Sequence, residues 1–256
     1  MGYKPIFPLL MSMAFPPMIS MLIQSLYNII DSIFVAQLGE SALTAVSLIY
    51  PLQNLSLAFS CGIGIAMNAI IARHLGAHND QEASDVASQG IVMSLLHSLL
   101  FVVIGLFFIR PFVSMFSSHQ EVIQYGIQYG TIVITFTFFS FVHLAIEKMF
   151  QASGDMIIPM IMQIVGAVVN IVLDPILIFG YFGFPALGVN GAAIATILGQ
   201  MSACFFIYLS FFINIVNIFM FLSNISKLIF KLLKISIVLP FLLVSCYVCH
   251  HYLFPF

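Results

Sequence analysis

Long apolar segments fill most of the chain and are separated by short polar stretches such as GESALT at 39–44 and QASGD at 151–155. A helix needs about 20 apolar residues to cross the hydrocarbon core of a bilayer. Each apolar segment meets that length, so the pattern predicts an all-α membrane protein whose core is a bundle of six transmembrane helices. The expected spans are roughly 8–36, 44–72, 87–109, 122–147, 157–181 and 188–214.

The composition agrees with a lipid bilayer as the main partner of the chain. Hydrophobic residues make up 62% of the sequence and charged residues only 6%, whereas soluble domains carry about 25% charged residues. A net charge of −2 without a basic stripe argues against nucleic acid as a partner. Lys4 is followed by apolar sequence almost to Gly39, too long for a cleavable signal, so the first span is expected to stay in the protein.

The basic residues predict how the chain crosses the membrane. With a cytoplasmic N-terminus only Arg110 falls outside, which obeys the positive-inside rule and predicts a multi-pass protein of the plasma membrane. The residues expected on the inner side are Lys4, Arg73, Lys148, Lys227, Lys231 and Lys234.

In the loop before the third span, Asn79 and Glu82 have the spacing of a capping box that opens the next helix.

The first span carries a carboxylate and three other polar side chains on one face. Gln24, Tyr27, Asn28 and Asp31 stand at i, i+3, i+4 and i+7, which places them on one side of a helix. Such groups must face the protein interior or a wet cavity, because an aspartate at the centre of a membrane helix costs about 2.5–3.5 kcal/mol. Hydrogen bonds between helices are the alternative use of the neutral members of this set.

A second polar pair lies in the fifth span, where Asn170 and Asp174 stand at i and i+4 and Pro175 removes a backbone donor. Two neighbouring carboxylates in a low dielectric cannot both stay ionised cheaply, so they can hold a proton or share a sodium ion. We therefore expect Asp31 and Asp174 to approach each other across one cavity. Oxygen ligands suit a hard cation, and such a site is suited to ion coupling in a secondary transporter.

Four segments carry a resemblance to a known family: LYNIIDSIFVAQLGESALTAVSLIYPLQN, ARHLGAHN, EKMFQASGD and LDPILIFGYFGFPALGVNGAAIAT. In order and spacing they closely resemble the multidrug and toxic compound extrusion (MATE) family of antiporters, over about residues 8–213. The resemblance implies one six-helix lobe of a two-lobe transporter that exchanges sodium or protons for amphipathic or cationic compounds. It implies no enzymatic activity and no cofactor other than the coupling ion.

The same resemblance implies roles for particular residues. The cation site would comprise Asp31, Asn170 and Asp174, completed by Thr196 in GAAIAT of the sixth span. Tyr27, with Gln24 and Asn28, would support the site. Pro16 would mark the first-span kink used in switching.

The chain departs from the family in having about half its length. We expect residues 1–214 to form the N-terminal lobe, and 215–256 to form an inner-side linker helix and the truncated start of a seventh span. LKISIVLP at 233–240 weakly echoes LLMSMAFP at 9–16. The expectation is an incomplete half-length product that does not transport alone, with a missing second lobe or a second copy of the chain as its partner.

Other functions remain as alternatives from the sequence. A lipid-linked saccharide flippase is a related multi-span transporter, and an intramembrane aspartyl protease would use two membrane aspartates as a catalytic dyad. Ile30-Asp31 and Leu173-Asp174 lack the motifs of that protease class. Cys246-Tyr-Val-Cys249-His250 matches a haem-attachment pattern, which we interpret as a chance match. Glu147 and Lys148 are interpreted as an ion pair at the end of the fourth span, with ion coupling as the alternative.

Overall fold

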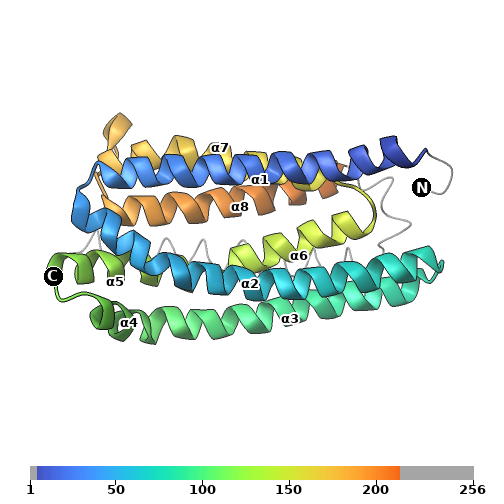
Figure 1. The fold of residues 1–256 in the computed structure, drawn as a ribbon, viewed down its shortest axis with the longest axis horizontal. Helices are drawn as coiled ribbons and strands as arrows, with labels where there is room; N and C mark the ends of the chain where they lie inside the picture. The colour runs from blue at the N-terminus through green and yellow to red at the C-terminus, as the bar shows by residue number, and fades with distance from the viewer. Residues whose placement is uncertain (1–4, 214–256) are drawn as a thin grey trace.

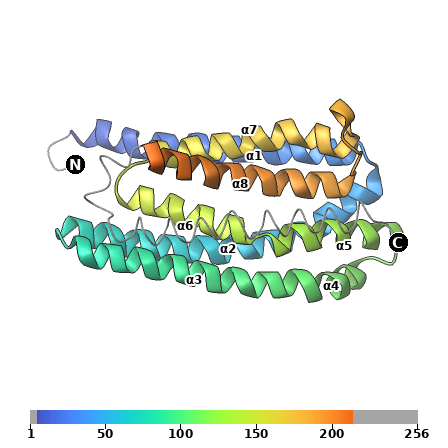
Figure 2. The same cartoon turned by 180° about the vertical axis from the view of Figure 1, so that it is seen from behind.

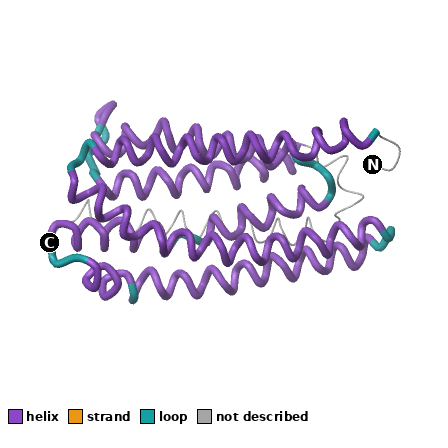
Figure 3. Tube along the Cα trace, viewed as in Figure 1, coloured by secondary structure: helices purple, strands orange, loops and turns teal. Residues whose placement is uncertain are grey.

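The computed structural model describes residues 5–213, and all its regular elements in that range are helical (Figures 1 and 3). The linker helix, the seventh span and the Cys246–His250 motif expected from the sequence lie outside the described residues. The elements are α1 (Ile6–Ala36), α2 (Glu40–Gly76), α3 (Asp80–Phe107), α4 (Ile109–Phe116), α5 (Gln120–Thr135), α6 (Phe138–Ala152), α7 (Ile157–Phe179), a 3₁₀ turn η1 (Tyr181–Gly183) and α8 (Val189–Ile213).

Five of these helices are long and apolar enough to cross a membrane, and α5 with α6 makes a sixth span if the bent pair is counted as one. This confirms an all-helical membrane protein with the expected set of spans. Large apolar side chains on the outside of α1, including Leu22 and Ile29, are more than half exposed. Apolar surface of this kind is what a helix presents to lipid.

The fourth span differs from its prediction as one continuous helix over 122–147. It is broken after Thr135, and α5 and α6 meet there at an angle of 41°. The hydroxyl of Thr137 donates to the carbonyl oxygen of Val133 at 3.0 Å, and such a bond to the preceding turn often bends a helix. Residues 135–138 include no Pro or Gly, so the sequence did not predict the break.

The helices form two groups, with α1, α7 and α8 on one side and α2, α3, α4 and α5 on the other, as the two opposite views show (Figures 1 and 2). The helix α6 packs against both α2 and α8, and α5 also reaches α8. One apolar core, around Phe101, Phe139 and Phe141, lies where α3, α5, α6 and α8 meet. A second, around Met67 and Met162, lies near the other end of α6.

Glycines let α7 and α8 approach each other closely. A Cβ added to Gly199 would lie 2.7 Å from the carbonyl oxygen of Gly166 and 3.1 Å from the Cβ of Asn170. Membrane helices use small residues at such contacts because lipid supplies no hydrophobic force between helices. The contact fixes the position of Asn170 against α8.

The predicted cap before the third span is confirmed in part. The side chain of Asn79 accepts a hydrogen bond from the backbone N–H of Glu82 at 3.4 Å, at the start of α3. The reciprocal bond of a capping box has no donor, because the N–H of Asn79 already donates to the carbonyl of His74 at 2.9 Å. The helix begins at Asp80, directly after the predicted cap residue Asn79.

Candidate functional site

A buried polar cluster joins α7 and α8. Asp174 is fully buried, Asn170 is 2% exposed and Thr196 is 9% exposed. One orientation of the Asn170 amide gives both its nitrogen and its oxygen a hydrogen-bond partner. In this orientation the nitrogen donates to Asp174 Oδ2 at 3.2 Å and the oxygen accepts from the Thr196 N–H at 3.1 Å. The opposite orientation would turn its oxygen toward the carboxylate and leave a longer contact of 3.5 Å to Thr196 Oγ1, so the first is preferred.

The α1 carboxylate comes to the same cluster. Asp31 and Asp174 are close enough to interact electrostatically. One oxygen of each, Oδ1, is buried and has no hydrogen-bond partner within the described residues. Buried unpaired carboxylate oxygens are costly, and a bound cation or proton would satisfy them. Carboxylate oxygens with the neighbouring hydroxyl oxygen of Thr196 fit a hard cation such as sodium.

Two tyrosines lie near the aspartates: Tyr27, which the sequence predicted, and Tyr129, which it did not. Tyr129 of α5 is 2% exposed, hydrogen-bonds with the side chain of Gln53 of α2, and lies within electrostatic reach of Asp31 and Asp174. Tyr27 lies within reach of the same two carboxylates. Tyr129 repeats Tyr125 at i+4 in QEVIQYGIQYGT, a spacing that could have marked this face of α5.

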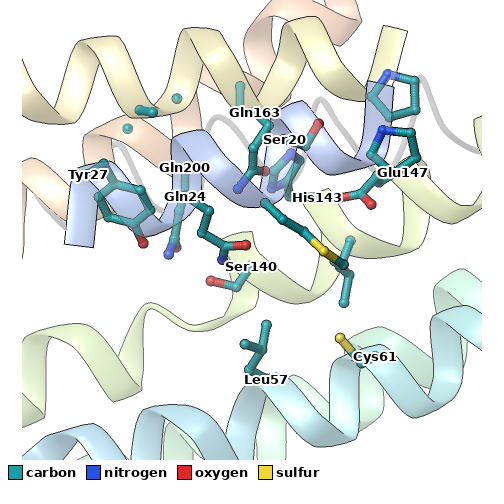
Figure 4. A pocket seen from close by; sticks show the side chains of 18 of the residues that line it. Ser20, Gln24, Tyr27, Leu57, Cys61, Ser140, His143, Glu147, Gln163 and Gln200 are labelled. Atoms are coloured by element: carbon teal, nitrogen blue, oxygen red, sulfur yellow. The ribbon is translucent and has the colours of Figure 1, made fainter. Parts of the chain in front are cut away.

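A cavity of about 580 Å³ lies beside the cluster, between α1, α2, α6, α7 and α8 (Figure 4). Tyr27, Asn170 and Thr196 belong to both the cluster and the cavity wall, whereas Asp31 and Asp174 are not lining residues of this cavity. The two aspartates interact beside this cavity, and Asn170, which bonds to Asp174, lies in its wall. That the aspartates face each other across a cavity stays a prediction. The other polar lining residues of the cavity are Ser20, Gln24, Cys61, Ser140, His143, Glu147, Lys148, Gln151, Gln163 and Gln200.

Three further predicted residues, Gln24, Asn28 and Pro16, lie on α1. Gln24 lines the cavity with Tyr27. Asn28 is half-buried and is not a lining residue of this cavity. Pro16 is buried within α1, which stays helical through it. The role of Pro16 in switching stays a prediction.

Two glutamines of α7 and α8 lie near the site although the sequence did not predict them as site residues. Gln163 precedes Asn170 by seven residues, and Gln200 follows Thr196 by four, so each lies on the face of the predicted site residue. Both line the cavity, and in Figure 4 the labelled side chains of Gln163, Gln200 and Gln24 lie near one another. The same helical spacing that found the cluster therefore extends to the cavity.

Glu147 and Lys148 form an ion pair in the cavity wall. Lys148 Nζ donates to Glu147 Oε1 at 3.0 Å and to Gln151 Oε1 at 3.0 Å, and Gln151 Nε2 donates to Glu147 Oε1 at 2.8 Å. The side chains of Lys148 and Glu147 are 19% and 15% exposed. The pair predicted from the sequence is confirmed, but it faces the cavity as well as ending the span.

The fold and the site together define a helical membrane protein with a polar interior, the class to which solute transporters belong. The chain belongs to the MatE family, the MATE transporters, because the model of that family matches residues 16–176.

The relatives agree with this assignment. The chain is 31% identical over 188 residues to the probable multidrug resistance protein YoeA of Bacillus subtilis, covering 73% of this chain and 41% of that protein. It is 32% identical over 207 residues to the multidrug export protein MepA of Staphylococcus haemolyticus, covering 80% and 45%. A solved structure of a MOP superfamily transporter from Pyrococcus furiosus superposes with a TM-score of 0.73 at 29% identity, covering 79% and 44%. The chain spans about half the length of the relatives it matches.

Proposed function

We propose that this chain forms a lobe of a cation-coupled antiporter that exports amphipathic or cationic compounds across the plasma membrane, with its N-terminus in the cytoplasm. The names of the multidrug relatives support the transported class. The cytoplasmic N-terminus is supported by the Lys and Arg residues, which all fall on the inner side except Arg110. Neither the flippase nor the protease alternative finds support among the relatives, and no catalytic role is proposed for any residue.

The observation that carries the proposal is the pair of buried carboxylate oxygens on Asp31 and Asp174 that have no partner within residues 5–213. Their mutual repulsion in a low dielectric falls when a sodium ion or a proton occupies the site. Asn170 would hold the Asp174 carboxylate in place from α7, and Thr196 would present its hydroxyl oxygen from α8, with Tyr27 and Gln24 beside them on α1. Sodium and proton are equally compatible with this donor set.

The shared residues support coupling between ion and compound. Asn170 donates to Asp174, the Thr196 N–H donates to Asn170, and both residues line the cavity. A change in the carboxylate site therefore moves atoms that a compound in the cavity would touch. By linkage, each ligand then changes the affinity for the other by the same factor.

Thermal unfolding of the purified chain in detergent, with sodium or choline chloride, tests the ion site. We expect sodium, or a lowered pH if the proton is the ion, to raise the melting temperature. Asp31→Asn and Asp174→Asn are each expected to remove the response. The matched control is Asp85→Asn, since Asp85 is exposed on α3. A response that survives both site substitutions would overturn the assignment.

A further inference from the structure

Within the described wall of the cavity, the carboxylate and ammonium side chains are those of Glu147 and Lys148, and they form an ion pair. Their position is fixed from α2. The stem of Lys148 packs on Gly64, where an added Cβ would lie 2.7 Å from Lys148 Cγ. The side chain of Asn68 donates to the backbone carbonyl of Lys148 at 3.0 Å.

The pair keeps unused hydrogen-bonding capacity. An ammonium group has three N–H donors, and Lys148 uses two of them, on Glu147 and Gln151. Glu147 Oε2 has no bond among the described residues, whereas Oε1 takes two. One turn before Glu147, the Nε2 of His143 is buried and without a partner in the described range. In Figure 4 the labelled His143 and Glu147 lie close together in the wall.

A wall with one positive and one negative group selects the charge pattern of its ligand. A cation that approaches Glu147 also meets Lys148, and an anion at Lys148 also meets Glu147, so much of the attraction cancels. A molecule that carries both charges can place its anionic group at Lys148 and its cationic group at Glu147. Both of its charges are then paired, which offsets the cost of bringing them out of water.

The size and the remaining lining suit a small organic molecule of this type. The cavity of about 580 Å³ lies within the usual range of about 300–1,000 Å³ for ligand pockets. Leu57, Leu144 and Met156 supply apolar contacts, and Gln163 and Gln200 supply neutral hydrogen bonds. We propose that the Glu147–Lys148 pair makes this cavity selective for zwitterionic amphipathic compounds over purely cationic ones.

This inference names the substrate class of the cavity and rests on that part of the proposed function, but it does not depend on the coupling ion. Rhodamine 110, a zwitterion at neutral pH, and rhodamine 123, its cationic methyl ester, form a matched pair of probes. Binding to the purified chain in detergent is measured by fluorescence polarisation without sodium. We expect rhodamine 110 to bind at least about fivefold more tightly.

Variants of the pair test whether its charges cause the preference. In Lys148→Gln the wall carries a net negative charge, so rhodamine 123 is expected to bind more tightly than rhodamine 110. In the double variant Glu147→Gln with Lys148→Gln the wall is uncharged, and the two probes are expected to bind alike. Lys148→Arg and the control Arg110→Gln, at an exposed position of α4, are expected to keep the wild-type order.

Three results would overturn the inference: equal binding of the probes by the wild type, no binding of either, or an order unchanged in Lys148→Gln. The folding of each variant is checked by size-exclusion chromatography and circular dichroism. If a single variant unfolds, the double variant, which keeps the net charge of the chain, still tests the inference. Loss of the sodium or pH response with the probe preference intact would refute only the ion site. An intact response without the preference would refute only the present inference.

Discussion

The Asn170 amide donates to Asp174 Oδ2 at 3.2 Å from one turn earlier on α7. Because the other end of the amide is held by the N–H of Thr196, the position of the carboxylate depends on the packing of α8. The cation site and the contact between α7 and α8 are therefore parts of one structure, and changes in either are expected to affect the other.

Asn170→Ala is expected to destabilise the protein and to weaken the response to the coupling ion. The substitution leaves Asp174 Oδ2 without its partner in a buried position, which costs about 1–3 kcal/mol. Chemical unfolding in detergent measures the loss. Asn28→Ala is the matched control, because Asn28 is half-buried, and it is expected to cost less. Equal losses for the two variants would contradict the geometry.

Gly199→Ala is expected to destabilise the protein by about 1–3 kcal/mol, the usual cost of overpacking. The new Cβ would lie 2.7 Å from the backbone oxygen of Gly166, which cannot move away as a flexible side chain can. Gly62→Ala in α2 is the control, since a Cβ there meets nothing within 4 Å. It is expected to be neutral or stabilising by about 0.5–1 kcal/mol. Melting temperatures of the two variants in the same detergent decide the point.

The polar faces of α1 and α7 could be predicted from the sequence because each lies within one helix. The spacing of Gln24, Tyr27 and Asp31, and that of Asn170 and Asp174, defines polar faces within one helix, so the inward direction of each face could be predicted. The family motif added Thr196. Gln24, Tyr27, Asn170 and Thr196 line the cavity, whereas Asp31 and Asp174 do not. No local sequence pattern separates these two groups, because the difference depends on how α7 packs on α8.

Residues that act across helices could not be placed in this way. Gln53 and Tyr129 meet because α2 and α5 are adjacent, and the i+4 spacing of Tyr125 and Tyr129 marks a face of α5 without showing which helix that face meets. Glu147 and Lys148 were expected as a pair because they are consecutive, but their place in the cavity wall depends on the bend between α5 and α6. At that bend the buried Thr137 hydroxyl donates to the carbonyl oxygen of Val133, and no helix-breaking residue is present.

Asp31→Asn and Asp174→Asn are expected to be non-additive in stability at alkaline pH without sodium. Either substitution removes the repulsion between the two carboxylates, so each single variant is expected to be more stable than the wild type. The double variant is expected to gain less than the sum, with a coupling energy of about 0.5–3 kcal/mol. The gain is expected to shrink as the pH is lowered, because protonation of the wild-type pair removes the same repulsion. Additive effects at alkaline pH would show that the carboxylates do not interact.

Cys61 is expected to report occupancy of the cavity. It lines the wall one turn after Leu57 on α2, whereas Cys204 of α8 is buried and outside the lining. In a variant with Cys204, Cys246 and Cys249 replaced by serine, N-ethylmaleimide is expected to label Cys61, and saturating rhodamine 110 is expected to slow the labelling. A variant that keeps only Cys204 is the control and is expected to react slowly with or without the probe, because its thiol is 2% exposed. Mass spectrometry of the intact chain over time gives both rates. Labelling of Cys61 that bound probe does not slow would place the compound elsewhere, since a molecule filling the cavity between α1, α2 and α6 must cover this thiol.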